Sequence, residues 1–353
     1  MSIKLAINGF GRIGRLAFRR AYEVGGFEVV AINDLVDANT LAYLLKYDTT
    51  HRTWHANEIS AEVEKDEAGN FIKNNLVFKG VRIPVLGKKD PHDLKWGEYG
   101  VDIVLECTGR LKSKEDGQVH LDNGAKGVII SAPSSSKDIP TFVYGVNTNT
   151  LTPDMKIISG GSCTTNCLAP VMKVINDTFG VRGGFMTTVH AYTNDQTILD
   201  LAKGNLRRGR AAAANIVPTT TGAAKAIKVV IPELDGKLMG GAVRVPVTDG
   251  SLVDLSLVLE NQNVTKEEIN AALKKASETS LKEVMDYTED EIVSSDILGA
   301  TAGSVFDATQ TVVFTDKTGL QHVKVVSWYD NEYSFTCQYV RLAGEYGKVL
   351  GCK

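Results

Sequence analysis

The stretch that decides the fold is IKLAINGFGRIGRLAF, residues 3–18. Residues 3–7 form the short apolar and β-branched run that is typical of a buried strand, and the second half of the stretch has the apolar spacing of a helix. Between them Gly9, Gly11 and Gly14 form the pattern G-x-G-x-x-G, which joins strand to helix in dinucleotide-binding domains. Glycines lack the Cβ atoms that would keep the backbone from a pyrophosphate, and a helix N-terminus offers N–H groups to the anion. The stretch therefore predicts a dinucleotide site.

Asp34 supplies the second part of this prediction. It closes the next predicted strand, where a carboxylate can accept hydrogen bonds from the ribose hydroxyls of the cofactor. The same carboxylate would repel a ribose 2′-phosphate, so it favours NAD over NADP. Thr108 and Ser131 follow two further predicted strands, and ligands of parallel sheets bind outside the carboxyl ends of the strands. We expect both at the same crevice, although a plain turn role is the alternative for each.

Short apolar runs alternate with helical patterns over the first 160 or so residues, which indicates a parallel sheet with crossover helices. These runs cover residues 3–7, 27–32, 101–105, 127–130, 142–146 and 156–158. The predicted fold class is therefore α/β, beginning with a doubly wound Rossmann domain over residues 1–161.

The pattern changes from residue 162 onward. The runs at 238–247 and 252–259 are longer and alternate between apolar and polar residues, as in antiparallel sheets with helices on one side. We predict a second, α+β domain over residues 162–330 with a mostly antiparallel sheet. Thr265 and Glu268 form a capping box at the start of one of its helices. A terminal helix within 331–353 is expected to dock back on the first domain.

The composition narrows the function classes. The 353 residues contain 39 Lys and Arg against 42 Asp and Glu, a net charge of -3, so a nucleic acid is not expected as the primary partner. No apolar run approaches the roughly 20 residues needed to span a bilayer. The N-terminus passes directly into the first predicted strand, without the pattern of a targeting leader. These features predict a cytoplasmic protein with no membrane association.

The five cysteines are scattered and odd in number, which does not suit a disulfide framework and fits a reducing compartment. Cys163 and Cys167 would lie on one face of a helix. No further Cys pair or His cluster beside them completes a zinc site. We therefore predict no metal.

Cys163 is the candidate nucleophile. A predicted strand turns through Gly160, Gly161 and Ser162 into a helix, which places Cys163 in the first helical turn. The helix dipole and free N–H groups stabilise a thiolate there, so the sequence predicts a pKa below the roughly 8.5 of a free thiol. Cys167, one turn further, is predicted to be a small buried apolar residue.

His190 ends the predicted strand over residues 184–190 and could serve as the base and later the acid that a cysteine nucleophile needs. A packed structural histidine is the competing interpretation. Spacing alone does not select His190 from the six histidines of the chain.

Eight segments, taken together and in order, show that the chain resembles the phosphorylating glyceraldehyde-3-phosphate dehydrogenase family along essentially its whole length. They are residues 7–15, 106–109, 131–134, 162–167, 190–193, 218–224, 244–246 and 328–332. The resemblance implies an enzyme of glycolysis that uses NAD and inorganic phosphate to convert D-glyceraldehyde 3-phosphate to 1,3-bisphosphoglycerate. Cys163 would form a thiohemiacetal and then a thioester, with His190 as the acid and base.

The resemblance also implies the remaining site residues. The substrate phosphate would bind near Thr193 and Arg244. The attacking phosphate would meet an arginine and several polar groups, namely Arg207 (with Arg208 close behind), Ser162, Thr164, Thr221 and Gly222. Further cofactor contacts would come from Arg12, Ile13, Lys89, Ser131 and Asn331. A loop over residues 193–210 would reach a neighbouring subunit of a homotetramer.

Two departures from the family pattern bear on these expectations. Gly160 and Gly161 stand where the family often has Asn-Ala before the serine, which loosens the turn without touching the chemistry. Ala202 replaces a proline that is frequent in NAD-specific relatives and weakens the prediction of strict NAD use, whereas Asp34 still favours NAD.

Two other functions stay open at this point. An erythrose-4-phosphate dehydrogenase on the same fold would hydrolyse its thioester with water and would not need phosphate. From another class, an NAD-binding redox sensor would use Cys163 as an oxidisable thiol, since thiols of low pKa oxidise readily.

Overall fold

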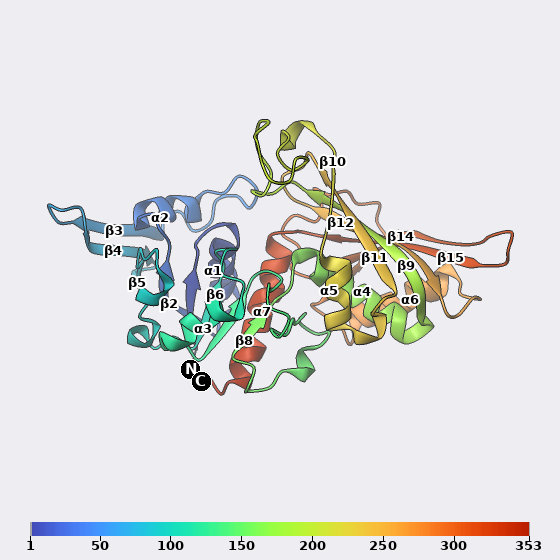
Figure 1. The fold of residues 1–353 in the computed structure, drawn as a ribbon, viewed down its shortest axis with the longest axis horizontal. Coiled ribbons are helices and arrows are strands. Elements are labelled where there is room, and N and C mark those ends of the chain that lie inside the picture. The colour runs from blue at the N-terminus through green and yellow to red at the C-terminus, as the bar shows by residue number, and fades with distance from the viewer. Residues whose placement is uncertain (1, 353) are drawn as a thin grey trace. The chain divides into compact units, whose positions relative to one another are not determined.

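The structure is a computed structural model that describes residues 2–352. The chain forms two compact units, drawn in Figure 1 and described separately below. Of the described residues, 2–142, 150–161 and 339–352 make up the first unit, and 143–149 and 162–338 make up the second.

The first unit is built on a five-stranded parallel sheet with the strand order β2-β1-β6-β7-β8. Its strands are β1 (Ile3–Asn8), β2 (Phe27–Asn33), β6 (Ile103–Glu106), β7 (Gly127–Ile130) and β8 (Ile157–Ser159). The inner strands β6 and β7 are buried along their whole length, as expected for strands covered on both faces. The helices α1 (Arg12–Val24), α2 (Ala38–Lys46) and α3 (Lys114–Asp122) connect them. This confirms the doubly wound Rossmann fold.

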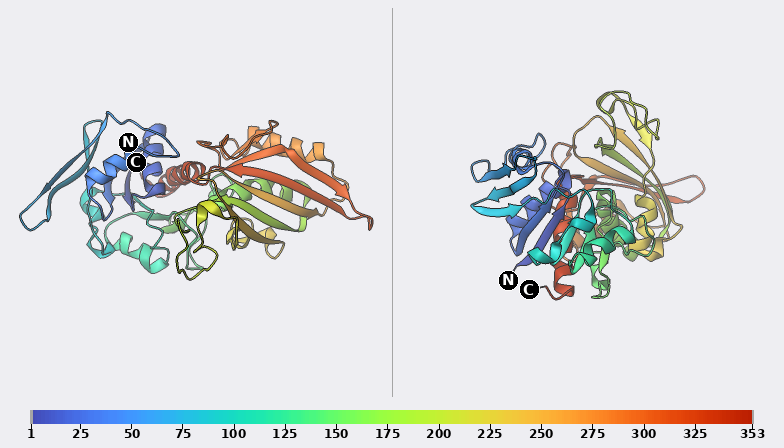
Figure 2. Two further views of the ribbon diagram at one scale, coloured as in Figure 1. Left: turned by 90° about the horizontal axis from the view of Figure 1, so that it is seen from above. Right: turned by 60° about the vertical axis from the view of Figure 1, so that its left-hand side comes forward.

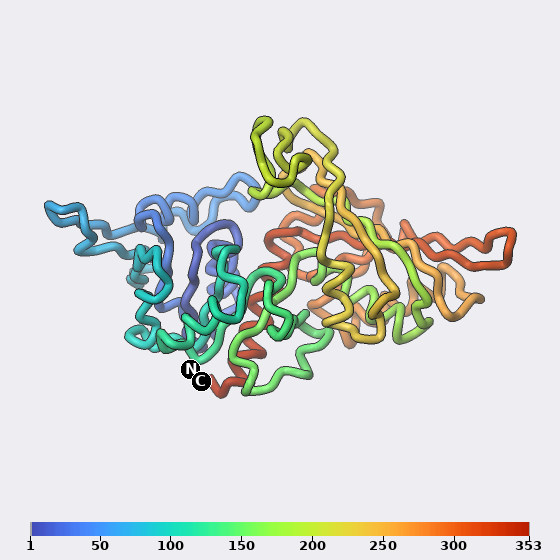
Figure 3. Tube along the Cα trace, in the orientation of Figure 1, coloured from blue at the N-terminus to red at the C-terminus, as the bar shows by residue number. Residues whose placement is uncertain are grey.

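A small antiparallel sheet that the sequence did not reveal follows α2. It consists of β3 (Ile59–Lys65), β4 (Phe71–Phe78) and β5 (Val81–Pro84), and it is visible as the blue hairpin in Figure 3. The two 3-10 helices Pro91–Asp93 and Trp96–Tyr99 lead from it to β6.

The predicted strand at 142–146 is wrong. Only Thr141 makes a strand-like bridge, to Ser159, and the Phe142 N–H donates to the Ser159 carbonyl before the chain turns. Gly145 has a φ of 75°, which a strand does not allow. The run was apolar because Phe142 and Val143 are buried, each in a different unit, so burial and not strand pairing explains the pattern.

The second unit has a seven-stranded sheet with the order β10-β11-β9-β12-β15-β14-β13, and only the β11–β9 and β13–β14 pairs are parallel. Its strands are β9 (Val181–Ala191), β10 (Val217–Thr219), β11 (Leu238–Val245), β12 (Ser251–Leu259), β13 (Met285–Thr288), β14 (Ser304–Thr315) and β15 (Gln321–Tyr329). The mostly antiparallel sheet is thus confirmed.

Three helices cover one face of this sheet (Figure 2): α4 (Cys163–Phe179), α5 (Ala223–Val230) and α6 (Lys266–Glu278). The buried residues of β12 alternate along the strand, so one face of the sheet enters the core and the other does not. The predicted capping box is present, with Thr265 and Glu268 bonded reciprocally at the start of α6. Short 3-10 helices lie at Thr148–Thr150, Ala212–Ala214 and Pro232–Leu234.

The terminal helix α7 spans Tyr333–Val349, and its residues from 339 onward belong to the first unit. The Tyr339 hydroxyl donates to the Ile129 carbonyl at 2.5 Å, and the Tyr346 hydroxyl donates to the Met155 carbonyl at 2.6 Å. These bonds hold the helix beside β7. Within residues 2–352, no helix combines the length and the apolar character required to cross a membrane.

Candidate active site

Cys163 is the first residue of α4. Ser162 has extended backbone angles and caps the helix, because its hydroxyl accepts a hydrogen bond from the Thr165 N–H at 3.2 Å. Because the Ser162 cap makes Cys163 the first residue of the helix, it also fixes the position of the Cys163 thiol. Cys167, one turn further, has no exposed surface, which confirms that it is a buried apolar residue.

His190 faces Cys163 from the end of β9. Its Nε2 atom lies 3.4 Å from Cys163 Sγ, and its Nδ1 atom lies 2.7 Å from the Ala191 carbonyl oxygen. A neutral imidazole donates through one nitrogen and accepts through the other. If Nδ1–H donates to the Ala191 carbonyl, Nε2 is left to accept a proton from the thiol, and the nearby Arg244 Nη1, which can only donate, bonds to the Ala191 carbonyl and not to Nδ1. The structure therefore brings together the two residues that the sequence could only name separately.

The predicted lowering of the Cys163 pKa is wrong. Burial raises the pKa of this thiol, and the nearby Arg244 guanidinium, which lowers it, does not offset that effect. Burial also lowers the pKa of His190 to about 3, with Arg244 as a second cause in the same direction. Both shifts favour the uncharged pair, a thiol beside a neutral imidazole. The helix-end argument failed because it could not include the desolvation that the surrounding fold imposes.

Arg244 completes this group. It lies on β11, directly opposite His190 in the strand register, and its Nη1 atom lies 2.8 Å from both His190 Nδ1 and the Ala191 carbonyl oxygen. A cation thus stands beside the imidazole, on the side away from the thiol.

Tyr329 is a member of the site that the sequence did not single out as a side chain. It is fully buried, and its hydroxyl lies 2.9 Å from Thr164 Oγ1 and 2.8 Å from Thr188 Oγ1. Its ring meets the His190 ring edge-on, with the centroids 5.8 Å apart. The tyrosine therefore ties the first turn of α4 to β9. Its place in the segment 328–332 was the only available signal.

Two neighbouring arginines of the loop over residues 193–210, Arg207 and Arg208, differ in burial and in their hydrogen bonds. Arg208 is half-buried, donates from Nε to Thr219 Oγ1 at 3.0 Å and from Nη2 to the Thr220 carbonyl at 3.1 Å, and pairs with Asp195. Arg207 is exposed and makes one long contact, 3.4 Å, to the Pro218 carbonyl. Of the two, Arg208 makes the shorter and more numerous hydrogen bonds to the segment that precedes α5.

The other predicted site residues of this unit lie at the start of α5, just after β9 and just after β15. Thr221 and Gly222 lie at the N-terminus of α5, where Thr221 Oγ1 accepts from the Ala223 N–H. Thr193 opens a turn just after β9, with its carbonyl bonded to the Gln196 N–H. Asn331 is buried, and its Oδ1 atom accepts a hydrogen bond from the Ser251 hydroxyl at 2.6 Å.

In the first unit a cavity of about 340 Å³ opens at the carboxyl ends of β1, β2 and β6. Five of the predicted cofactor residues line it, namely Gly9, Gly11, Asp34, Lys89 and Thr108. Arg12, Ile13, Gly14 and Ser131 are not among its lining residues within the described chain; Arg12 pairs with Asp48 instead.

The cavity suits a dinucleotide. No side chain caps the N-terminus of α1, and no acidic residue stands in its first turn, so this end is open to an anion. A Cβ atom at Gly11 would meet no protein atom within 4 Å, so glycine here leaves pocket space free. The Asp34 carboxylate accepts from the Phe10 N–H at 2.8 Å and thereby fixes the glycine loop beside the end of β2.

Comparison with known proteins agrees with both halves of this description. The family model "Glyceraldehyde 3-phosphate dehydrogenase, NAD binding domain" matches residues 3–114, and the model of the C-terminal domain matches residues 162–331. The glyceraldehyde-3-phosphate dehydrogenase of Clostridium pasteurianum is 54% identical over 98% of this chain and 99% of its own length. The enzyme of that name from Geobacillus stearothermophilus is 53% identical over 97% and 98%.

The chain belongs to the glyceraldehyde-3-phosphate dehydrogenase family. As a member, it is an NAD-dependent oxidoreductase.

A buried polar network underlies this cavity of the first unit. Glu106 accepts hydrogen bonds from Asn8 Nδ2 at 2.6 Å, from the Thr108 N–H at 2.8 Å, and from His120 Nε2 at 3.1 Å. Trp96 Nε1 in turn donates to His120 Nδ1 at 3.0 Å. The carboxylate thus positions Asn8 and Thr108, two of the lining residues. The sequence did not reveal this network, because its members lie on four separate segments.

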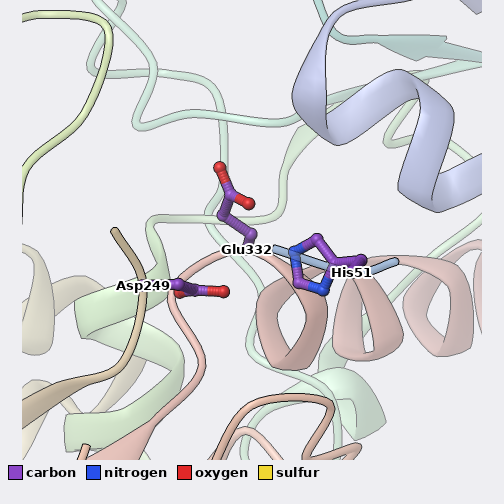
Figure 4. A group of neighbouring side chains, drawn as sticks. All are labelled: His51, Asp249 and Glu332. Atoms are coloured by element: carbon purple, nitrogen blue, oxygen red, sulfur yellow. The ribbon is translucent and has the colours of Figure 1, made fainter. Parts of the chain in front are cut away.

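Figure 4 draws two acidic side chains of the second unit, Asp249 and Glu332, with His51 of the first unit. Burial and the neighbouring Asp330 raise the pKa of Asp249 to about 9, so this carboxyl group is protonated at neutral pH. A protonated carboxyl group is a poor ligand for a cation. We assign no metal ion to these residues.

Alanine variants of two glycines in the motif should have different effects, one on the stability of the fold and the other on NAD binding. A Cβ at Gly14 would lie 2.1 Å from the Gly9 carbonyl oxygen, so we expect Gly14→Ala to push α1 from β1 and to destabilise the fold by about 1–3 kcal/mol. Gly11→Ala meets no such contact and should unfold at the wild-type temperature, yet bind NAD more weakly. Thermal unfolding and NAD titration of both variants test this. Wild-type NAD affinity in Gly11→Ala would rule out a close approach of the cofactor at Gly11.

Proposed function

We propose that this chain is the glycolytic dehydrogenase that oxidises and phosphorylates D-glyceraldehyde 3-phosphate to 1,3-bisphosphoglycerate, through a thioester on Cys163. The observation that carries the proposal is the 3.4 Å contact between Cys163 Sγ and His190 Nε2 at the capped start of α4. It supplies a nucleophile and a proton acceptor within reach of one another.

The first step uses the pair directly. His190 Nε2 takes the thiol proton while Sγ attacks the aldehyde carbon, and His190 returns that proton to the carbonyl oxygen to give a thiohemiacetal. His190 then removes the hydroxyl proton as the carbonyl group re-forms, which leaves a thioester on Cys163. Bound NAD would accept the hydride that leaves the carbon. One imidazole can serve each step because it alternates between base and acid.

The thioester is then cleaved by inorganic phosphate. A phosphate oxygen attacks the acyl carbon, the C–S bond breaks, and Cys163 leaves as a thiolate that recovers its proton from His190. We assign the attacking phosphate to Arg208, with Ser162, Thr164, Thr221 and Gly222 as further contacts. Arg208 replaces Arg207 in this proposal because only Arg208 is held beside the Thr219–Thr220 segment. We assign the substrate phosphate to Arg244 and Thr193.

For the cofactor, we propose that Gly9, Gly11, Asp34, Lys89 and Thr108 hold NAD, supported by the cavity that they line. Roles for Arg12, Ile13, Gly14, Ser131 and Asn331 stay predictions from the family resemblance.

We also propose a homotetramer in the cytoplasm. The loop between β9 and β10 carries large apolar side chains in the open, with Ile198, Leu199 and Leu206 exposed by 87%, 76% and 82%. Apolar side chains gathered in this way favour a protein contact over water. None of the five cysteines, all of which lie within residues 2–352, forms a disulfide bond, which suits a reducing compartment.

The test is the dependence of NADH formation on inorganic phosphate. With glyceraldehyde 3-phosphate and NAD present, we expect continuous turnover only when phosphate is added, because the thioester otherwise accumulates. Arg208→Gln should raise the KM for phosphate by about 10–100-fold, the loss of a charge-assisted hydrogen bond. Arg207→Gln removes the same charge one residue away and should leave this KM within about twofold of the wild-type value.

Turnover that is unaffected by omitting phosphate would overturn the proposal and favour hydrolysis by water, as in an erythrose-4-phosphate dehydrogenase. A larger effect in Arg207→Gln than in Arg208→Gln would reverse the assignment of the arginine.

A further inference from the structure

Glu106, the last residue of β6, has a buried carboxylate with four hydrogen-bond donors around it. Its Oε1 atom faces the N–H and the hydroxyl group of Thr108, and its Oε2 atom faces Asn8 Nδ2 and His120 Nε2. An ionised carboxylate only accepts hydrogen bonds, and each of its oxygens can take two donors. The arrangement therefore suits the carboxylate anion and does not suit a protonated carboxyl group.

The neighbours of these donors fix the direction of each hydrogen bond. The Trp96 indole N–H can only donate, so His120 accepts it at Nδ1 and carries its own proton on Nε2, toward Glu106. Thr108 Oγ1 accepts the Arg110 N–H at 3.1 Å, and its hydroxyl proton is directed to Glu106. Both side chains therefore donate to the carboxylate.

A chain of two amides connects the carboxylate to one segment of the cavity lining. Asn8 and Asn33 are register partners at the ends of β1 and β2, and Asn33 Nδ2 donates to Asn8 Oδ1 at 2.8 Å. Asn33 Oδ1 in turn accepts the Lys88 N–H at 2.8 Å. A backbone N–H only donates and a carboxylate only accepts, so the chain between Lys88 and Glu106 holds both amides in one orientation. It thereby fixes residues 88–89, which line the cavity.

Thr108 connects the same carboxylate to a second segment, residues 108–111. Its N–H donates to Glu106 at 2.8 Å, and its Oγ1 atom accepts the N–H groups of Arg110 and Leu111 at 3.1 and 3.4 Å. Thr108, Arg110 and Leu111 all line the cavity. A hydroxyl group has one proton to donate and two lone pairs, so the hydrogen bonds of this one are all made within the protein.

We propose that Glu106 is a positioning residue for NAD, because from behind the cavity lining its carboxylate fixes the 88–89 and 108–111 segments relative to one another. The strands β2 and β6 lie on either side of β1, so these two segments flank the glycine loop that follows β1. Hydrogen bonds to a buried anion are stronger than those between neutral groups. Glu106 is not among the lining residues within the described chain, so it would act through Asn8 and Thr108. The inference rests on the proposed binding of NAD in this cavity.

The experiment compares two variants that each replace one buried carboxylate of the first unit. Glu106→Gln turns an amide N–H toward groups that already donate. We expect the Kd for NAD to rise at least about tenfold, the effect of losing hydrogen bonds to a charged group. The KM for NAD should rise in parallel, with kcat at saturating NAD changed by less than about twofold. Calorimetric titration of the full-length protein with NAD and steady-state kinetics measure these values.

Asp102→Asn is the matched control. Asp102 is also buried, but it lies just before β6, at the end of the strand opposite Glu106. It accepts the Lys4 N–H at 2.9 Å and pairs with Lys126 at 2.7 Å. Its replacement should lower the temperature of thermal unfolding, as Glu106→Gln does, and leave the Kd for NAD unchanged. A general loss of stability is thereby separated from a loss of positioning.

A second pair of variants tests the connection through Thr108. Thr108→Val keeps the shape of the side chain but lacks the hydroxyl group, and we expect it to raise the Kd for NAD by about three- to tenfold. Thr108→Ser retains the hydroxyl group and should bind NAD at least about threefold more tightly than Thr108→Val. Because the protein already uses this hydroxyl completely, the weaker binding of Thr108→Val would report a displaced 108–111 segment and not a lost hydrogen bond to NAD.

A wild-type Kd in folded Glu106→Gln, or an equal rise of the Kd in Asp102→Asn, would overturn the inference. If Glu106→Gln does not fold, the Thr108 variants decide, since wild-type affinity in Thr108→Val contradicts the inference. Equal weakening of Thr108→Val and Thr108→Ser contradicts it as well. The wild type is titrated separately. Failure of the wild type to bind NAD would contradict the proposed cofactor site, whereas binding that none of the variants weakens would contradict only this inference.

Discussion

Cys163→Ser is expected to reduce NADH formation by about 10⁴–10⁶-fold, the range seen when an enzyme loses its nucleophile. Serine preserves the shape of the side chain, but a hydroxyl group is far less acidic than a thiol and would not form the thioester. The variant should still bind NAD, because Cys163 is not among the residues that line the cofactor cavity. The measurements are NADH absorbance during turnover and a fluorescence titration with NAD.

Cys167→Ser is the matched control. Cys167 lies one turn along α4, is fully buried, and has a thiol whose pKa burial raises to about 12. It contacts the hydroxyl of Ser304 at 3.6 Å, a partner that a serine can also use. We expect wild-type turnover in this variant. Activity retained in Cys163→Ser would rule out the covalent mechanism, and NAD binding by a wild-type protein without dehydrogenase activity would favour the redox-sensor function.

The sequence allowed the fold to be predicted where local pattern and burial agree. The glycine motif after β1 and the alternation along β12 each follow directly from the spacing of apolar residues. The hairpin of β3 and β4 was missed because many of its residues are exposed, which leaves little apolar periodicity. At residues 142–146 an apolar run indicated a strand, but the chain turns there.

The sequence allowed the residues of the candidate site to be predicted, but not the direction in which their pKa values are shifted. The start of α4 at Cys163 follows from Ser162 and the preceding glycines, which are local signals. The direction of the thiol pKa depends on burial by the surrounding fold and on Arg244, which is far away in the sequence. Tyr329 and Thr164 form a hydrogen bond across 165 residues, and no spacing argument can find such a contact.

His190→Asn is expected to lower kcat by about 10²–10⁴-fold, the usual contribution of a general acid and base. Asparagine can still donate to the Ala191 carbonyl, but it cannot take the thiol proton or the hydroxyl proton of the thiohemiacetal. The KM for glyceraldehyde 3-phosphate should change little, because Arg244 stays in place on β11. Steady-state kinetics with separate kcat and KM values, and the size of the NADH burst in a single turnover, measure the effect.

The pH dependence has a definite sign. Because the pKa of His190 is lowered to about 3, the imidazole of the free enzyme stays neutral from pH 5 upward, so protonation of His190 should cause no loss of kcat/KM between pH 5 and pH 8. The raised pKa of Cys163 makes the thiolate scarce at neutral pH, so activity without His190 should depend on hydroxide and rise with pH. His322→Asn is the control, since His322 pairs with Asp316 at 3.0 Å away from the catalytic pair. A kcat within about threefold of wild type in His190→Asn, or a pH profile that the substitution leaves unchanged, would show that the 3.4 Å contact is not the path of the proton.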